Sequence, residues 1–443
     1  MRKWILLGVL VIISLLSLFS HQILPDTPVN ENDIPNFDSA DISWMLVASA
    51  MVLIMTPGLG FFYGGMVRKK NVISTILQSF IAMGVITMVW VIVGFSLAFG
   101  PSIGGIIGNP FTYMFFHNVG VNTAWPLAPT IPFVLFAVFQ MKFAIITPAL
   151  ISGAFAERIR FWGYIMFITL FSIVIYAPLA HAVWHPDGIL FKYGVLDFAG
   201  GTVVHMSAGW AALAGALFLK QRKEKVFEPS RITYVILGTA LLWFGWFGFN
   251  AGSAMGSNAL AVQAFVDTTV ASAAAAIGWG FIEKIKGKKI SAMGVAIGAV
   301  VGLVAITPAA GFVSTAHAIL IGIIAVTVSS IMVDLRSKTN IDDTLDVFPC
   351  HGVGGLVGMV LTGVFASPEI NSAVTEPGLI FGETSLFIKH MIALVAVSAF
   401  AFFGSYALLY ITNLITPLRV TEEYEMEGLD RTQHGETLYS SSN

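Results

Sequence analysis

Two histidines are the residues of this chain most suited to chemistry, because each lies in an apolar, glycine-bordered stretch. His205 occurs in the string GGTVVHMS (200–207) and His351 in PCHGVGG (349–355). An ionisable side chain within lipid is costly and indicates a functional site. Two adjacent imidazoles can share one hydrogen bond and still offer nitrogen atoms to a passing species. The alternative is two unrelated buried histidines, each satisfied by a neighbouring carbonyl.

Aromatic residues suggest what would meet these histidines. Phe143 follows Gln140, Trp184 ends an apolar run, and the string GWFGFNAGS (245–253) contains Trp246, Phe249 and Ser253. A cation can lie over an indole or phenyl face, and a hydroxyl or amide can accept its hydrogen bonds. Tryptophan and serine near the outer surface therefore fit recruitment of a small cation. Lipid-facing or core packing is the alternative for each aromatic taken alone.

The composition indicates the environment that holds these residues. Of 443 residues, 56% are hydrophobic and only 11% are charged, and the mean hydropathy is +0.82. Soluble domains carry about 25% charged residues. The 43 glycines suit helices that approach closely in lipid. The sequence therefore predicts an all-α membrane protein.

The apolar runs are long enough to predict about eleven transmembrane helices, since about 20 residues cross a bilayer. We place the helices at 42–64, 72–99, 131–154, 161–183, 202–219, 232–251, 262–282, 291–308, 313–333, 350–366 and 386–416.

The charged residues of the connecting loops predict the orientation. Lysine and arginine cluster in alternate loops (68–70, 158–160, 220–231, 284–289 and 336–338), and excess positive charge marks the cytoplasmic side. Acidic residues follow the first apolar run (Asp26, Glu31, Asp33, Asp38, Asp41). We expect a multi-pass cell-membrane protein whose processed N-terminus is outside and whose C-terminus is cytoplasmic.

The N-terminal segment has two interpretations. Arg2 and Lys3 precede an apolar run, which is typical of a secretory signal peptide over 1–24. No clear cleavage site follows, so a retained extra helix is the alternative. The transmembrane domain would then cover 25–417 and a cytoplasmic tail 418–443.

Ten of the helices divide into two sets of five. Because five is an odd number, the second set of helices must cross the membrane in the opposite sense to the first. This predicts two inverted five-helix repeats plus one C-terminal helix. Asp197 precedes His205 by eight residues, and Asp346 precedes His351 by five. The unequal spacing makes this a hint only. Asp197 is also placed to accept hydrogen bonds from the free N–H groups that begin the fifth helix.

Five strings in order along the chain resemble signatures of the Amt/Mep/Rh ammonium transporter family. They are FYGGMVR (62–68), GAFAERIR (153–160), DFAGGTVVH (197–205), GWFGFNAGS (245–253) and DVFPCHG (346–352). The match runs from about residue 41 to the tail. Trp184, Ser253 and the 245–253 string follow the Amt branch.

The resemblance implies roles for individual residues. Trp184 and Ser253, with Phe143 beside them, match an outer ammonium recruitment site, and Phe143 and Phe249 match two stacked phenylalanines that close the pore. His205 and His351 match a twin-histidine pair. The supporting positions that match the family are Asp197, Gln140, Trp246 and Thr307. The implied function is recruitment of ammonium, its deprotonation, and conduction of ammonia with or without the proton.

The resemblance also implies partners, and one residue of this chain departs from the family pattern. It implies a homotrimer with one pore per subunit, ammonium and in some cases methylammonium as substrate, and a cytoplasmic tail that regulatory PII-type proteins contact. A disordered acidic end is the alternative for the tail. Lys142, between Gln140 and Phe143, does not fit the family pattern. Facing outward it can snorkel toward an interface; facing the vestibule it would oppose a cation.

Other classes of protein fit less well. Net charge is −2, which disfavours nucleic acid, and the single Cys350 excludes an intrachain disulfide. We find no nucleophile–base set, nucleotide loop or metal cluster, so we expect no enzyme, cofactor or metal. Two alternatives stay open: an ammonium receptor with little or no flux, and a channel for water or another small neutral solute.

Overall fold

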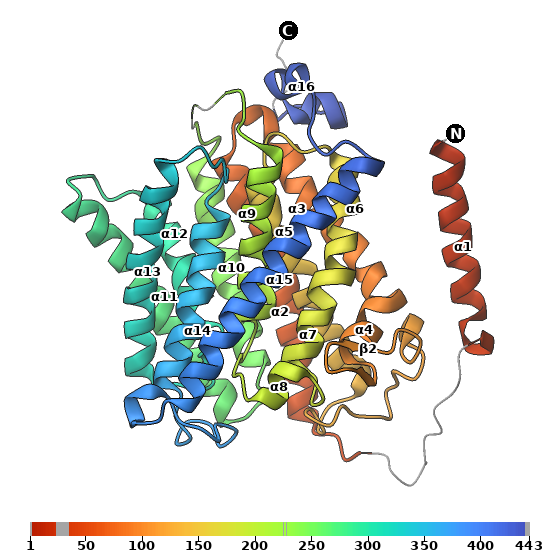
Figure 1. Cartoon of the computed structure of the whole chain (residues 1–443), viewed down its shortest axis with the longest axis vertical. Helices are drawn as coiled ribbons and strands as arrows, with labels where there is room; N and C mark the ends of the chain where they lie inside the picture. The colour runs from red at the N-terminus through yellow and green to blue at the C-terminus, as the bar shows by residue number, and fades with distance from the viewer. Residues whose placement is uncertain (1, 24–34, 225, 227, 439–443) are drawn as a thin grey trace.

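The computed structural model is a bundle of long, roughly aligned helices (Figure 1). It describes residues 2–23, 35–224, 226 and 228–438. Within these residues, ten helices are long and apolar enough to cross a membrane. The chain is therefore a helical, multi-pass membrane protein, as the composition predicts.

The helices agree closely with the apolar runs. The main helices of the bundle are α2 (Ser39–Met66), α3 (Val72–Val89), α5 (Phe133–Phe155), α6 (Phe161–Phe171), α7 (Ala177–Trp184), α9 (Ser207–Leu219), α10 (Ile232–Gly252), α11 (Ala259–Ile285), α12 (Ala292–Ile306), α13 (Thr315–Ser337), α14 (Gly354–Phe365) and α15 (Ser385–Ile415). Short π-helical turns extend several of them: η3 (Trp90–Gly94) joins α3 to α4 (Phe95–Phe99), η5 (Ser172–Tyr176) joins α6 to α7, η6 (Gly201–Met206) precedes α9, and η7 (Phe348–Val353) precedes α14.

Short elements cover the two ends of the bundle. One end carries α8 (Ile189–Tyr193) and the hairpin of β1 (Ser102–Ile103) with β2 (Ile107–Gly108). The opposite end carries α16 (Glu422–Glu427) and η9 (Asp430–His434) (Figure 1). We call these the α8 end and the α16 end.

Two regions bear on the predicted number of spans. The expected span over 291–308 is α12, which has only 15 residues and is shorter than the other spanning helices. Arg2–Ile23 form helix α1, which lies to one side of the bundle (Figure 1). Whether α1 is a signal peptide stays a prediction, and its boundary at residue 24 lies outside the described residues.

Glycines set how closely the helices approach. A side chain at Gly238 of α10 would overlap the backbone of α2 at Phe62 and Gly58. A side chain at Gly209 of α9 would likewise overlap the backbone of Gly352 in η7. Small residues allow such close contacts in lipid. The second contact presses η7 against α9 and so brings the segments of His205 and His351 together.

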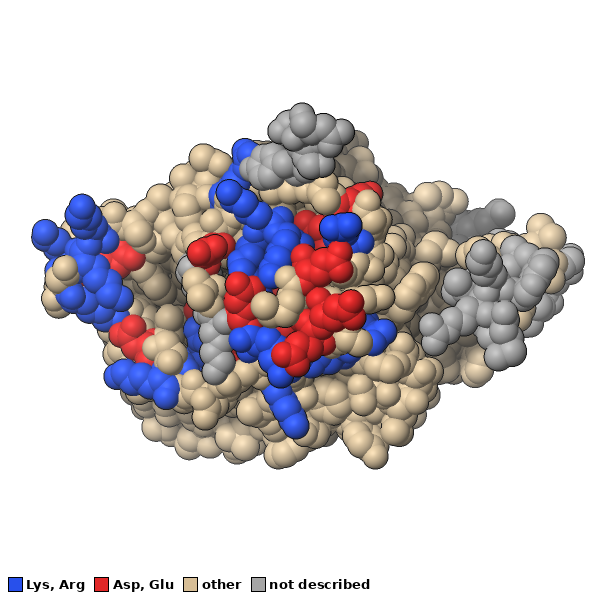
Figure 2. Space-filling view, turned by 90° about the horizontal axis from the view of Figure 1, so that it is seen from above, with Lys and Arg blue, Asp and Glu red and all other residues tan. Residues whose placement is uncertain are grey.

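The α16 end is rich in charge (Figure 2). Buried Glu157 pairs with Arg68 at 2.6 Å and with Arg222 at 2.8 Å. Burial opposes ionisation of Glu157, but these two arginines outweigh it and lower the pKa of the carboxyl. Arg222 also pairs with Asp342 at 2.9 Å. The loops that the sequence groups as basic are thus held together by ion pairs.

The tail is folded onto this charged end as far as residue 438. Buried Asp430 accepts hydrogen bonds from the backbone N–H groups of Ile73 and Ser74 at the start of α3. Glu425, also buried, binds Arg419 and the backbone of Lys223. The alternative of a wholly disordered acidic end therefore does not hold for these residues.

Candidate functional site

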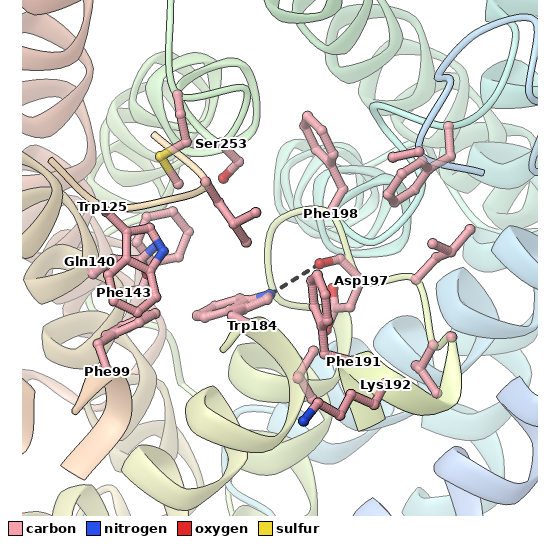
Figure 3. Close-up of a pocket in the computed structure, with 18 of the residues that line it drawn as sticks. Phe99, Trp125, Gln140, Phe143, Trp184, Phe191, Lys192, Asp197, Phe198 and Ser253 are labelled. Atoms are coloured by element: carbon pink, nitrogen blue, oxygen red, sulfur yellow. Dashed lines mark hydrogen bonds between the residues drawn. The ribbon is translucent and has the colours of Figure 1, made fainter. Parts of the chain in front are cut away.

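A cavity of about 450 Å³ opens at the α8 end. Trp184, Ser253 and Phe143, which the sequence analysis grouped as an outer site, line it together with the supporting residues Gln140 and Asp197 (Figure 3). They come from α7, α5, the end of α10 and the turn before η6. Its walls are mainly apolar and include eight aromatic residues, with polar side chains from Gln140, Lys192, Asp197, Ser253 and Thr375.

Asp197 holds the wall of this cavity in place. Its Oδ1 accepts from the N–H groups of Gly200 and Gly201 at 2.8 and 2.7 Å, and Oδ2 accepts from the N–H and hydroxyl of Thr202. These are free donors at the start of η6. Trp184 Nε1 donates to the Asp197 carbonyl at 3.1 Å (Figure 3). The predicted capping role of Asp197 is confirmed, and its backbone also orients the indole.

Two phenyl rings separate the cavity from the interior of the bundle. The rings of Phe143 and Phe249 lie 4.2 Å apart between centroids, and Phe143 meets Trp184 edge-to-face at 5.9 Å. Both phenylalanines are fully buried. Ser253 donates its hydroxyl proton to the Phe249 carbonyl at 2.9 Å. Its oxygen therefore keeps its lone pairs as acceptors beside the two rings.

The two histidines meet directly below the phenyl rings. His205 Nδ1 and His351 Nδ1 are 3.4 Å apart, and their rings are 5.4 Å apart between centroids. His205 also stacks on Trp246 at 5.3 Å. Trp246 Nε1 donates to the Thr307 hydroxyl at 2.9 Å, which fixes the indole. The structure therefore brings together all ten residues selected from the sequence, in one column from the outer cavity to His351.

Small enclosed cavities lie on both sides of His351. One, of about 10 Å³, is bordered by His205, His351 and Phe249. Another of about 10 Å³ is bordered by His351, Cys350 and Tyr63 toward the α16 end. Each has room for about one water-sized molecule. His205 Nε2 is buried and has no hydrogen-bond partner among the described residues, so it is available to a guest in the upper cavity.

The aspartate that corresponds to Asp197 in the second half is Asp343, and our choice of Asp346 is wrong. Asp343 accepts from the N–H groups of Val347 and Phe348 at 3.1 and 2.7 Å. Asp346 instead pairs with Arg336 at 2.8 Å. Asp343 precedes His351 by eight residues, the same spacing as Asp197 and His205. The mismatch in spacing therefore came from choosing the aspartate nearer in sequence.

Lys142 is half-buried on α5 and is absent from the linings of the outer cavity and of the cavity beside His205. Its neighbours Gln140 and Phe143 do line the outer cavity. The interpretation in which Lys142 faces away from the vestibule therefore agrees with the structure.

Most residues that line the outer cavity were not selected from the sequence, and two of them stand out by their chemistry. Trp125 lines it and stacks on Phe136 at 5.3 Å between centroids. Lys192 lines it too and pairs with Asp187 at 2.6 Å. Trp125 belongs to a long segment between helices that has no apolar periodicity, so only its residue type could have drawn attention. Lys192 lies outside the basic loops and carries no motif that would have singled it out.

The fold and this column define a multi-helix membrane protein with a pair of contacting histidines buried in its bundle. The family model described as Ammonium Transporter Family matches residues 43–439. An ammonium transporter of Aquifex aeolicus is 46% identical over 408 residues (91% of this chain, 94% of that protein), and one of Bacillus subtilis is 45% identical over 404 residues (91% and 99%). The chain therefore belongs to the ammonium transporter family.

Solved structures agree with this assignment. The crystal structure of Saccharomyces cerevisiae Mep2 matches with a TM-score of 0.83 at 36% identity, covering 88% of this chain and 89% of that one. A structure described as a sensor Amt protein matches with a TM-score of 0.81 at 28% identity, covering 89% and 98%. Mep2 and a protein described as a sensor thus share this fold.

Proposed function

We propose that this protein is an ammonium transporter that recruits ammonium in the outer cavity and delivers ammonia through the histidine column. The observation that carries the proposal is the uninterrupted order of Trp184, Phe143, Phe249, His205 and His351. Aromatic faces attract a cation. Gln140 and Ser253 supply oxygen atoms for its N–H groups.

Deprotonation follows from the change in environment along the column. Ammonium in water keeps several hydrogen bonds, whereas the phenyl pair offers it only ring faces. A bare charge in such a medium is very costly. Ammonium therefore passes its proton to water in the outer cavity and crosses the phenyl pair as neutral ammonia. His205 Nε2 can then exchange a hydrogen bond with ammonia, and the contact between the two Nδ1 atoms gives a route for the proton.

Orientation and partners form part of the proposal. Lysine and arginine gather over the α16 end (Figure 2), and positive charge favours the cytoplasm. We therefore place the α16 end inside and the outer cavity outside. We extend the proposal to a homotrimer, to methylammonium as a further substrate, and to a PII-type protein that contacts the α16 end.

The test is an ammonium pulse applied to proteoliposomes on a solid-supported membrane. We expect a transient current for the wild-type protein and a current at least about tenfold smaller for His205→Ala. His317→Ala is the matched control. His317 lies in α13, where its ring stacks on that of Phe365 with the ring centroids 4.5 Å apart, and it lines neither small cavity. A full current in His205→Ala would overturn the role of the column. No current in any variant would exclude electrogenic transport and leave neutral ammonia flux, which a pH-sensitive dye inside the vesicles measures.

The second candidate function is an ammonium receptor with little or no flux, and the match to a structure described as a sensor Amt protein favours it. Isothermal titration of the purified protein with ammonium distinguishes the two. Binding that Trp184→Ala abolishes, without dye-detected flux in the wild type, would establish the receptor. A neutral-solute channel predicts instead that flux survives Trp184→Ala and Ser253→Ala.

A further inference from the structure

A second recess, of about 670 Å³, lies at the α16 end, apart from the histidine column. Its lining includes four cationic residues and an apolar floor: Lys220, Arg222, Lys223, Arg419, Leu217 and Ile341. No aspartate or glutamate is among its lining residues. The function proposed above uses none of these side chains, so the recess needs its own explanation.

The recess lies at the depth of a lipid headgroup. The membrane-spanning segment that contains α9 ends at Leu219, and Lys220 follows immediately. Leu217, in the last turn of α9, is 43% exposed. An exposed leucine one turn below an exposed lysine is the pattern of a bilayer boundary, where acyl chains give way to polar headgroups.

Two arginines of the recess are held rigidly by the protein. Arg222 donates to both oxygens of Asp342 and to Glu157. Arg419 donates to the carbonyl oxygens of Leu219 and Gln221 and to Glu425. A guanidinium group has five N–H donors, so each arginine keeps donors that these contacts do not occupy. Planar, fixed donors of this kind suit phosphate oxygens.

The two lysines are less constrained. Lys220 is exposed and has no ion-pair partner among the described residues. Lys223 pairs with Glu422 at 3.0 Å, but both side chains are more than half exposed, and such surface pairs contribute little. Both ammonium groups are therefore free to turn toward an anion in the recess.

We propose that this recess binds the headgroup of an anionic phospholipid from the leaflet at the α16 end. The phosphate would lie between the guanidinium groups of Arg222 and Arg419, with Lys220 and Lys223 as flexible positive charges. The apolar floor of Leu217 and Ile341 favours a lipid over free phosphate, because it can hold the glycerol backbone and the start of an acyl chain. Basic pockets between helices at a membrane surface recognise such headgroups.

Native mass spectrometry of the delipidated, full-length protein tests the proposal. Phosphatidylglycerol and phosphatidylcholine are titrated separately onto the wild type, Lys220→Gln/Lys223→Gln, and the control Lys288→Gln/Lys289→Gln. The control removes the same charge from exposed residues in the turn between α11 and α12, outside the recess. We expect tighter binding of phosphatidylglycerol than phosphatidylcholine, and about tenfold weaker phosphatidylglycerol binding in the recess variant only.

A second variant and a second ligand complete the test. Lys220→Arg/Lys223→Arg keeps both charges and should bind phosphatidylglycerol as the wild type does, which separates loss of charge from misfolding. Equal phosphatidylglycerol affinities in the recess and control variants would overturn the site. Displacement of phosphatidylglycerol by millimolar inorganic phosphate would overturn the lipid assignment and indicate a soluble anion. None of these outcomes depends on ammonium flux, so failure here is distinct from failure of the proposed transport.

Discussion

The two histidine-bearing halves of the molecule use the same local device at opposite ends. In each, an aspartate accepts hydrogen bonds from the start of a π-helical turn, and a histidine follows eight residues later. The surroundings differ. Asp197 lines a cavity of about 450 Å³, whereas Asp343 is fully buried beneath charged loops. The same cap therefore borders the outer cavity in one half and lies in the buried interior in the other.

This comparison predicts that Asp197→Ala has the largest effect on transport. Its loss frees the N–H groups of Gly200 to Thr202 and shifts the carbonyl that orients Trp184. A displacement of about 1 Å can cost about a hundredfold where geometry matters, and we expect ammonium current to fall at least that much. Glu383→Gln, which removes an acidic charge from an exposed residue outside the lining of the cavity, is the control. Normal current in Asp197→Ala would show that the cap does not position the site.

The histidines should behave as one unit, since their Nδ1 atoms are in contact at 3.4 Å. We expect His205→Ala and His351→Ala each to lower the current about tenfold or more, and the double variant to lose little beyond either one. The effects of substituting two residues in contact with each other do not simply add. Losses that multiply in the double variant would show that the two rings act separately. Initial currents of the three variants at equal protein density provide the measurement.

Asp343→Ala tests the opposite half and should act on stability. Each buried donor left without a partner costs about 1–3 kcal/mol, and the change leaves two, on Val347 and Phe348. We expect about 2–4 kcal/mol lower stability, measured as the midpoint of thermal unfolding in detergent. Molecules that remain folded should keep most of their current. A selective loss of current with an unchanged midpoint would mean that Asp343, like Asp197, shapes the transport path.

Much of this arrangement follows from the sequence, and the failures have physical causes. Apolar length predicts the spans because lipid requires satisfied backbone groups. The ten residues selected from the sequence lie close together in the structure. The aspartate of the second half was misassigned, because spacing along the chain does not reveal which carboxylate turns inward. Asp346 has an unusual backbone angle, φ +56°, which the sequence does not predict. The partners of Glu157 were also not predicted, since its ion pairs join loops far apart in sequence.

Asp346→Ala should have the smallest effect and so sharpens the contrast with Asp343. Asp346 pairs with Arg336 at 2.8 Å, and both side chains are about one-fifth exposed. Because the pair is only partly exposed, its loss should cost more than that of a surface pair, about 1–2 kcal/mol, but less than the loss of the buried cap at Asp343. Alanine does not relieve the backbone here, because it also disfavours positive φ. We expect a thermal midpoint within a few degrees of the wild type and unchanged current. A loss of stability as large as that of Asp343→Ala would restore Asp346 as the counterpart of Asp197. The equal spacing of aspartate and histidine would then no longer support inverted repeats.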